Sequence, residues 1–170
     1  MISVAQGTEY RKGEIIIFTG TENIPCPVCG GHLRVHGTCT RKLRRRNGTD
    51  VYRLRVMECK LCGKTHRELP DGIVPYKRMD AERLSDITEA AEEKNLGDVE
   101  TSTWKRVREW VLWFLDYALK VLRSLQTLYG TELPTVSPDD FLSRRLKYSV
   151  RLVVNSGNWI QHRSAVQAGL

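Results

Sequence analysis

The sequence predicts an α+β protein in which a small, metal-stabilised β-unit precedes a set of α-helices. Three observations support this fold class. Two Cys-x-x-Cys-Gly motifs begin at Cys26 and Cys59, β-prone segments lie between them, and amphipathic patterns with helix-capping signals follow from Asp80. We expect five segments: 1–25 with one strand, 26–69 as the β-unit, 70–79 as a linker, 80–130 as paired helices, and 131–170 as a C-terminal helix and tail.

One structural zinc ion is predicted to be bound by the four cysteines of the two motifs, Cys26, Cys29, Cys59 and Cys62. Two residues between cysteines let one tight turn direct two sulfurs at the same metal, and four-thiolate zinc sites use this spacing. The glycine after each pair suits a turn with positive φ. A thioredoxin-like redox motif would not come doubled, and disulfides would need an export signal that the N-terminus lacks.

Cys39 and His66 are the other candidate ligands near this site. Four thiolates already complete a tetrahedral zinc site, so we expect Cys39 to be a free thiol. His66 could replace a lost thiolate. With four cysteines present, we expect it instead beside the site, at a phosphate or simply at the surface.

Strands are predicted at Val51–Met57, which alternates apolar with charged residues, and more weakly at Leu33–Thr38. Asn47-Gly48 between them is a hairpin signal. Two strands that leave two metal-binding turns and meet in a hairpin form a zinc ribbon, whose small core needs the metal for stability. A further strand at Glu14–Phe18 either joins this sheet or packs on the helices.

Three helices are predicted. Asp80 is an N-cap for the first helix, which should end near Asn95 with its turn at Gly97. Thr101-Ser102-Thr103 offers capping hydroxyls for the second, so this pair fits a helix-turn-helix pattern. Ser137-Pro138-Asp139-Asp140 has the composition of a helix start, and this third helix should end at Asn155-Ser156-Gly157.

The apolar stripe of the second helix runs unbroken from Trp104 to Leu128. A stripe of this kind usually forms the core. It is widened by Leu112, Leu115, Leu119 and Leu122, which leaves room for a coiled-coil-like face that would form a homodimer.

Charge is distributed unevenly along the chain. The net charge is +7, and from Arg34 to Glu68 eleven Lys and Arg residues stand against three acidic ones. From Asp80 to Glu100, eight acidic residues stand against two basic ones. The basic segment favours a polyanion partner, most often nucleic acid, over the alternative of a solvated charged face.

Several classes of protein do not fit the sequence. No run of about 18 apolar residues suggests a membrane span, and five cysteines without an export signal suggest a reducing cytoplasm. No Ser-His-Asp set or phosphate-binding loop is recognisable, so we expect neither an enzyme nor a small-molecule substrate.

A family resemblance supports this interpretation. The order Cys-Pro-x-Cys-Gly, a basic ribbon, Cys-x-x-Cys-Gly-Lys-x-His-Arg-Glu-Leu-Pro and Val-Pro-Tyr-Lys-Arg resembles the N-terminal zinc-ribbon and helix-turn-helix region of bacterial insertion-sequence transposases. The chain also resembles a stand-alone bacterial family of unknown function, often found near mobile elements. Residues 26–79 carry most of the likeness, and Ser-Thr-Trp at 102–104 and the tail at 154–160 add to it. Cys39 stands where a basic residue is expected.

The resemblance implies DNA binding but not catalysis, because such transposases cut DNA with three carboxylates on a further RNase H-like domain. Double-stranded DNA in the nucleoid is the expected partner of a transposition accessory factor, a transposase remnant or a regulator. The alternative is a zinc-ribbon module that docks on an acidic protein and self-associates through its long helix.

The candidate DNA contacts fall into two groups. Phosphates are expected at Arg41, Lys42, Arg44, Arg45, Arg46, Arg53, Arg55, Lys77 and Arg78. Base edges are expected at Thr103, Lys105, Arg106 and Arg108, with Trp104 and Val107 facing inward. The alternatives are that the connector residues dock the ribbon on the helices, and that the helix turn pairs with Glu92 or Glu93.

Overall fold

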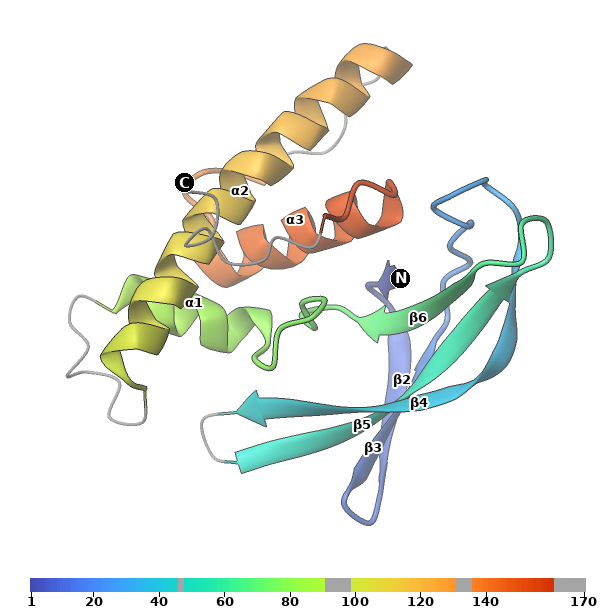
Figure 1. The fold of residues 1–170 in the computed structure, drawn as a ribbon, viewed down its shortest axis with the longest axis horizontal. Coiled ribbons are helices and arrows are strands. Elements are labelled where there is room, and N and C mark those ends of the chain that lie inside the picture. The colour runs from blue at the N-terminus through green and yellow to red at the C-terminus, as the bar shows by residue number, and fades with distance from the viewer. Residues whose placement is uncertain (46–47, 91–98, 131–135, 161–170) are drawn as a thin grey trace, which may run out of the picture.

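The computed structural model describes residues 1–45, 48–90, 99–130 and 136–160, which form a curled β-sheet beside three α-helices (Figure 1). The predicted α+β class is therefore observed. The strands are β1 (Ile2–Val4), β2 (Gly7–Lys12), β3 (Ile15–Gly20), β4 (Leu33–Arg45), β5 (Gly48–Cys59) and β6 (Thr65–Pro70). The helices are α1 (Ala81–Glu89), α2 (Thr101–Tyr129) and α3 (Leu142–Asn155).

Strand β5 is the centre of the sheet. Its whole length pairs antiparallel with β4, while its other edge is shared by β6, which is antiparallel, and β3, which is parallel. Strand β2 continues the sheet beyond β3, and β1 continues it beyond β6. The strand predicted near Glu14–Phe18 thus joins the sheet. The four-cysteine unit is part of a larger sheet built with the N-terminal strands, two of which, β1 and β2, were not predicted.

The basic run of β4 lies at the end of the strand, next to the connection to β5, as predicted. Strand β4 was predicted to end at Thr38 but continues to Arg45, paired from Leu33 opposite Cys59 to Arg45 opposite Gly48. The weak sequence signal has a physical cause, because Leu43 is the only residue of the basic run that is fully buried. Residues 46–47, which include half of the predicted Asn47-Gly48 turn, lie outside the described residues.

Two hydrophobic clusters meet at the connector between β6 and α1. One cluster fills the sheet and includes Leu43 and Leu54, while the other lies between the helices and includes Val111 and Leu146. The connector is irregular, as its prolines and glycine predict. Two adjacent connector residues, Ile73 and Val74, are both buried. Ile73 belongs to the sheet cluster and Val74 to the helical cluster, so the connector joins the two clusters.

Helix α1 begins as predicted and ends early. The Asp80 side chain accepts a hydrogen bond from the Arg83 backbone N–H at 2.8 Å, which is an N-cap. The helix stops at Glu89, where Ala90 turns to an extended conformation, and not near Asn95. Residues 91–98, including the predicted turn at Gly97, lie outside the described residues.

The expected helix-turn-helix arrangement is not observed in the described residues. Helix α2 begins at Thr101 with Glu100 as N-cap, so the three hydroxyl residues form its first turn and do not cap it. Helix α1 ends at Glu89, before the predicted end near Asn95, and the predicted turn at Gly97 lies outside the described residues. The other end follows prediction, since Gly130 ends the helix in the left-handed conformation with φ of 61°.

Helix α3 begins later than predicted. Residues Ser137 to Asp140 form a hydrogen-bonded turn of their own, in which the Asp140 carboxylate accepts from Ser137 N–H at 3.2 Å and the Ser137 hydroxyl accepts from Asp139 N–H at 3.3 Å. The helix itself starts at Leu142. Its end at Asn155 agrees with the prediction.

The end of α3 joins the helices to the sheet. The Asn155 side chain accepts from Ser3 N–H and donates to the Ser3 carbonyl, both at 2.8 Å, so it pairs with β1 as another strand would. Gly157 lies against the Pro27 carbonyl at the first cysteine motif, where no side chain would fit. Trp159 covers the helical cluster, with its ring 5.3 Å from that of Phe114. These contacts explain the sequence pattern of the tail.

Among the described residues, no helix combines the length and apolar character needed to cross a membrane.

Candidate metal centre and basic surface

The two Cys-x-x-Cys motifs fold into two equivalent turns. In the first, Gly30 N–H donates to the Cys26 carbonyl at 2.8 Å, and in the second, Gly63 N–H donates to the Cys59 carbonyl at 2.9 Å. Both glycines have positive φ, 73° and 69°, as the sequence predicts. The second turn joins β5 to β6, and the first lies just before β4, so the β4–β5 pairing brings the two turns together.

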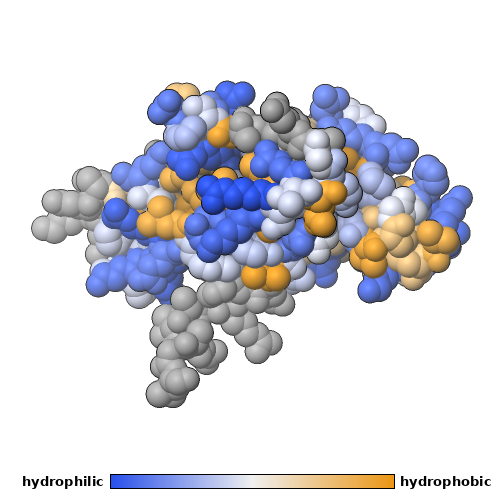
Figure 2. Space-filling view, turned by 90° about the horizontal axis from the view of Figure 1, so that it is seen from above, coloured by the Kyte–Doolittle hydropathy of each residue, from blue (hydrophilic) through white to orange (hydrophobic). Residues whose placement is uncertain are grey.

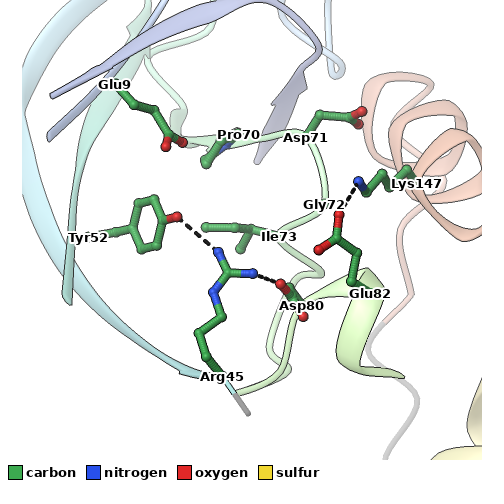
Figure 3. Close-up of a pocket in the computed structure, with 10 residues that line it drawn as sticks. All are labelled: Glu9, Arg45, Tyr52, Pro70, Asp71, Gly72, Ile73, Asp80, Glu82 and Lys147. Carbon is green, nitrogen blue, oxygen red and sulfur yellow. Dashed lines mark hydrogen bonds and ion pairs between the residues drawn. The ribbon is translucent and has the colours of Figure 1, made fainter. Parts of the chain in front are cut away.

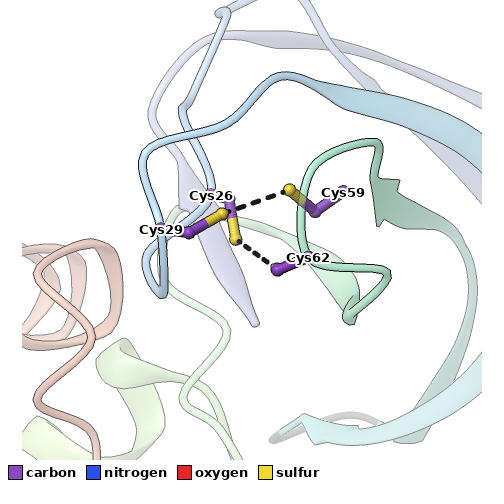
Figure 4. A group of neighbouring side chains, drawn as sticks. All are labelled: Cys26, Cys29, Cys59 and Cys62. Carbon is purple, nitrogen blue, oxygen red and sulfur yellow. Dashed lines mark hydrogen bonds between the residues drawn. The ribbon is translucent and has the colours of Figure 1, made fainter.

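The four cysteine sulfurs lie within 4.8 Å of one another (Figure 4). The sulfurs of Cys26 and Cys62 are 3.8 Å apart and those of Cys29 and Cys59 are 3.4 Å apart. Disulfides are excluded, because they need about 2.05 Å. Sulfurs at about 2.3 Å from a tetrahedral metal would be about 3.8 Å apart, so the cluster has the dimensions of a four-thiolate site for one metal ion.

The pKa values of the cysteine thiols indicate that the cluster favours a bound cation. Hydrogen bonds from the backbone N–H of Cys62, and then of Leu61, lower the pKa of Cys59 to about 6 against the effect of burial. The Gly31 N–H favours the thiolate of Cys29, yet the neighbouring cysteine sulfurs together with burial raise the pKa of Cys29 to about 12. Four thiolates this close repel one another, and a divalent metal removes that repulsion.

Gly31 is the residue that sequence reasoning missed at this site. A Cβ on Gly31 would lie 3.0 Å from the Cys59 sulfur and 2.8 Å from the Leu61 Cβ. Its backbone also closes the first turn, since the Gly31 carbonyl accepts from Cys26 N–H at 2.9 Å. The Gly-Gly pair after Cys29 was the available sequence signal.

His66 is buried beside the cluster and is not part of it. Its Nε2 lies 3.3 Å from the Cys26 sulfur, close enough to donate a hydrogen bond to a metal-bound thiolate. Burial lowers the pKa of His66, which favours the neutral ring needed for that role. The fifth cysteine, Cys39, lies on β4 against the sheet cluster and outside the four-sulfur group.

Four of the predicted phosphate contacts interact instead with other parts of this chain. Arg41 donates to the carbonyls of Val74 and Lys77, each at 2.6 Å, and so fixes the connector to β4. Arg55 pairs with buried Glu68 at 2.6 Å and donates to the Gly20 carbonyl. Lys77 lies 4.0 Å from the centroid of the Trp110 ring, and Arg45 forms ion pairs with acidic residues.

Arg45 lines a polar cavity of about 170 Å³ between the sheet, the connector and the helices (Figure 3). It pairs there with Asp80 and donates to the Tyr52 hydroxyl at 3.0 Å. Across the cavity, Lys147 of α3 pairs with Glu82 of α1 at 2.9 Å. Both cations of the cavity pair with carboxylates, and these ion pairs join the sheet to α1 and α1 to α3. Glu9 and Asp71 add further negative charge to the lining, so the cavity does not suit a phosphate.

Three basic residues, Lys42, Arg44 and Arg78, line an open groove of about 670 Å³ on the outer face of the sheet. Lys42 and Arg44 alternate with the inward residues of β4 and lie opposite Val51 and Thr49 of β5. Arg78 completes the groove because residues 78–79 run beside Arg44, whose N–H donates to the Arg78 carbonyl at 2.6 Å. Within the described part of the chain, no carboxylate forms an ion pair with these three cations. We call this surface the β4 groove.

Strand alternation separates only the β4 members of these two sets. Arg41 and Arg45 share the inward face with Leu43, whereas Lys42 and Arg44 face outward. Arg53 is exposed on the same outward face, opposite Thr40. By contrast, no sequence signal places Arg78 next to Arg44. Arg46 lies outside the described residues.

The start of α2 is also exposed. Its second turn carries the exposed residues Lys105, Arg106 and Arg108, while its N-cap is the acidic Glu100. Arg106 donates to the Ser102 carbonyl and Thr103 hydroxyl, and the Arg108 guanidinium lies 5.4 Å from the centre of the Trp104 ring. Trp104 and Val107 are half-buried, as an inward orientation requires. The predicted alternative partners, Glu92 and Glu93, lie outside the described residues.

Residues 26–107 match the model of a domain of unknown function, DUF6431. The matched segment includes the four cysteines, the β4 groove, the connector, α1 and the start of α2. Neither curated proteins nor solved structures gave a significant match to the chain.

Proposed function

We propose that this protein is a zinc-dependent DNA-binding protein in which the metal centre is structural and the β4 groove contacts the phosphate backbone. The carrying observation is the β4 groove, where Lys42, Arg44 and Arg78 lie together without ion-pairing carboxylates among the described residues. Lys and Arg side chains grouped in this way bind phosphates and release counterions. We propose no catalytic role.

Zinc is the metal that best suits the four cysteines. Thiolates are soft ligands, and a tetrahedral set of four thiolates is typical of structural zinc. The two turns that hold the sulfurs connect β4, β5 and β6, so the ion would fix the strands that present Lys42 and Arg44. In this proposal, the loss of zinc removes DNA binding by unfolding the sheet.

The first two turns of α2 are the proposed second contact. Their exposed basic side chains, Lys105, Arg106 and Arg108, can contact phosphates or reach base edges. In Figure 1, the end of β4, where the chain passes into β5, and the beginning of α2 both lie on the left of the molecule. We assign the reading of base edges to Thr103, Lys105, Arg106 and Arg108. The relation to transposase accessory factors, remnants or regulators is part of this proposal.

The groove can be tested by neutralising its three cations together. The Lys42→Ala/Arg44→Ala/Arg78→Ala variant should weaken binding to any duplex, and the slope of log K against log salt should fall by up to about three. The matched control removes three exposed cations elsewhere that have no ion-pair partner among the described residues, Lys12, Lys64 and Arg123, and should change both quantities much less. Equal losses in the two variants, measured by fluorescence anisotropy, would mean that net charge and not the groove binds DNA.

A second candidate function rests on an apolar surface at the metal centre. Val28 and Leu61, between the cysteines of each pair, are 53% and 74% exposed, and Val35 is 54% exposed. Figure 2 shows hydrophobic residues gathered at the right end of the molecule, where Figure 1 has the turns that flank β4, β5 and β6. Such a patch suits docking on a protein. This candidate would replace the first if the zinc-loaded protein failed to bind duplex DNA at low salt.

A further inference from the structure

Helix α2 carries a buried apolar stripe and, beside it, a second apolar stripe of which only part packs inside the molecule. The first includes Val111, Phe114 and Ala118, which are buried against α1 and α3. The second stripe lies next to it and repeats with the three-and-four spacing of a coiled-coil seam. It consists of Leu112, Leu115, Leu119, Leu122 and, one heptad further, Tyr129.

The second stripe is open to solvent at three positions: Leu112 is 55% exposed, Leu119 is 43% exposed and Tyr129 is 70% exposed. Leu122 is buried, Leu115 packs against the helical cluster, and the polar Gln126 lies between Leu122 and Tyr129. Figure 1 shows the C-terminal half of α2 projecting beyond α3. The stripe from Leu112 to Tyr129 is about 26 Å long, which is enough for two to three heptads of contact. It is continuous with the helical core, so a second helix could extend the same packing.

Charges on the outer flank of this stripe indicate the direction of the helix that would cover it. Asp116 lies on this flank toward the N-terminal half, and Arg123 lies one heptad later on the same flank. Asp116 is exposed and pairs with Lys120 of its own helix at 2.7 Å. Arg123 is an exposed cation. If two copies of α2 ran in the same direction, each charge would lie level with its own counterpart. If they ran in opposite directions, Asp116 of one copy would approach Arg123 of the other.

We propose that two copies of this chain associate through the second stripe of α2, with the two helices antiparallel. The self-complementary charge order argues for a second copy, because one flank supplies both the acidic and the basic side of the contact. A dyad between Leu119 and Leu122 would place Leu112 of one copy opposite Tyr129 of the other. This interface does not depend on the DNA-binding proposal, since the β4 groove and its cations are not part of it.

The stripe is tested by sedimentation of the full, zinc-loaded chain. A single helix pair buries less area than a typical stable interface, so we expect a dimer at about 50 µM that dissociates on dilution. The Leu112→Glu/Leu119→Glu variant should be a monomer at the same concentration. The control Leu128→Glu introduces a charge at a residue that is 75% exposed and off the stripe, and this variant should remain a dimer. A wild-type chain that is monomeric to about 500 µM, or a dimer that survives the double change, would overturn the proposal.

Charge exchange tests the direction of the helices. At low salt, Asp116→Lys or Arg123→Glu alone should weaken the dimer about threefold, since each places like charges together. The double exchange Asp116→Lys/Arg123→Glu should restore wild-type affinity in an antiparallel pair. Continued weakening in the double variant would contradict the antiparallel arrangement. Circular dichroism and metal content, measured on every variant, separate lost association from lost folding.

Discussion

At the scale of single residues, the glycines around the metal centre determine what the turns can accommodate. Gly31→Ala should loosen the metal, because its Cβ would lie 3.0 Å from the Cys59 sulfur and 2.8 Å from the Leu61 Cβ. We expect faster zinc transfer to a chromogenic chelator and a fall in stability of about 1–3 kcal/mol. Gly37→Ala is the control, since a Cβ there meets nothing within 4 Å. Equal zinc transfer in both variants would show that the Gly31 contact does not matter.

Lys77 gives a prediction about pH. Burial lowers the pKa of Lys77 from 10.5 to about 8, so between these values the unfolded chain binds the proton more strongly than the folded chain does. The contribution of Lys77 to stability should therefore rise as pH increases from about 8 to about 10.5. In Lys77→Met, which can still pack on the Trp110 ring, this rise should be absent.

Urea unfolding of the wild-type chain and Lys77→Met at several pH values measures the difference between them. If the two stability curves stay parallel from pH 7 to pH 10.5, Lys77 has an ordinary pKa and its ammonium is free. Lys77→Met should also leave DNA affinity nearly unchanged, because the ammonium lies over Trp110 and away from the β4 groove.

At the scale of elements, the junction between α3 and β1 depends on one side chain. Asn155→Ala removes both hydrogen bonds to Ser3 and leaves the partly buried N–H and carbonyl of Ser3 without these partners. The free energy of unfolding should fall by about 1–3 kcal/mol. Asn158→Ala is the matched control, because that exposed side chain donates only to Ser156. Thermal melts of the two variants give the comparison. A loss in Asn158→Ala as large as that in Asn155→Ala would rule out a special role for this junction.

The sequence predicted these elements unevenly, for physical reasons. Strong local signals, such as the Asp80 cap, the end of α2 at Gly130 and the β-prone run before Cys59, were found correctly. Strand β2 was missed because it is exposed along its whole length and shows no alternation. The start of α3 was misplaced because Ser137 and Asp140 close a separate turn.

The candidate site divides in the same way. The four cysteines follow from spacing alone, since the chemistry of one metal fixes both the residue type and the separation within each pair. The basic residues do not, because the same residue types serve as internal bonds at Arg41 and Arg55 and as free cations at Lys42 and Arg44. That difference depends on the β4–β5 register and on the path of the connector, which are tertiary properties.

At the scale of the whole molecule, we expect one metal ion at the four cysteines to hold the sheet together. Native mass spectrometry of protein purified without added metal tests this most directly. We predict one zinc per chain. It should be retained in Cys39→Ser and lost in Cys59→Ser together with the folded sheet, because Cys59 belongs to the four-sulfur cluster and Cys39 does not. A wild-type chain that carries no metal and yet gives the same circular dichroism and melting curve before and after zinc addition would contradict the account.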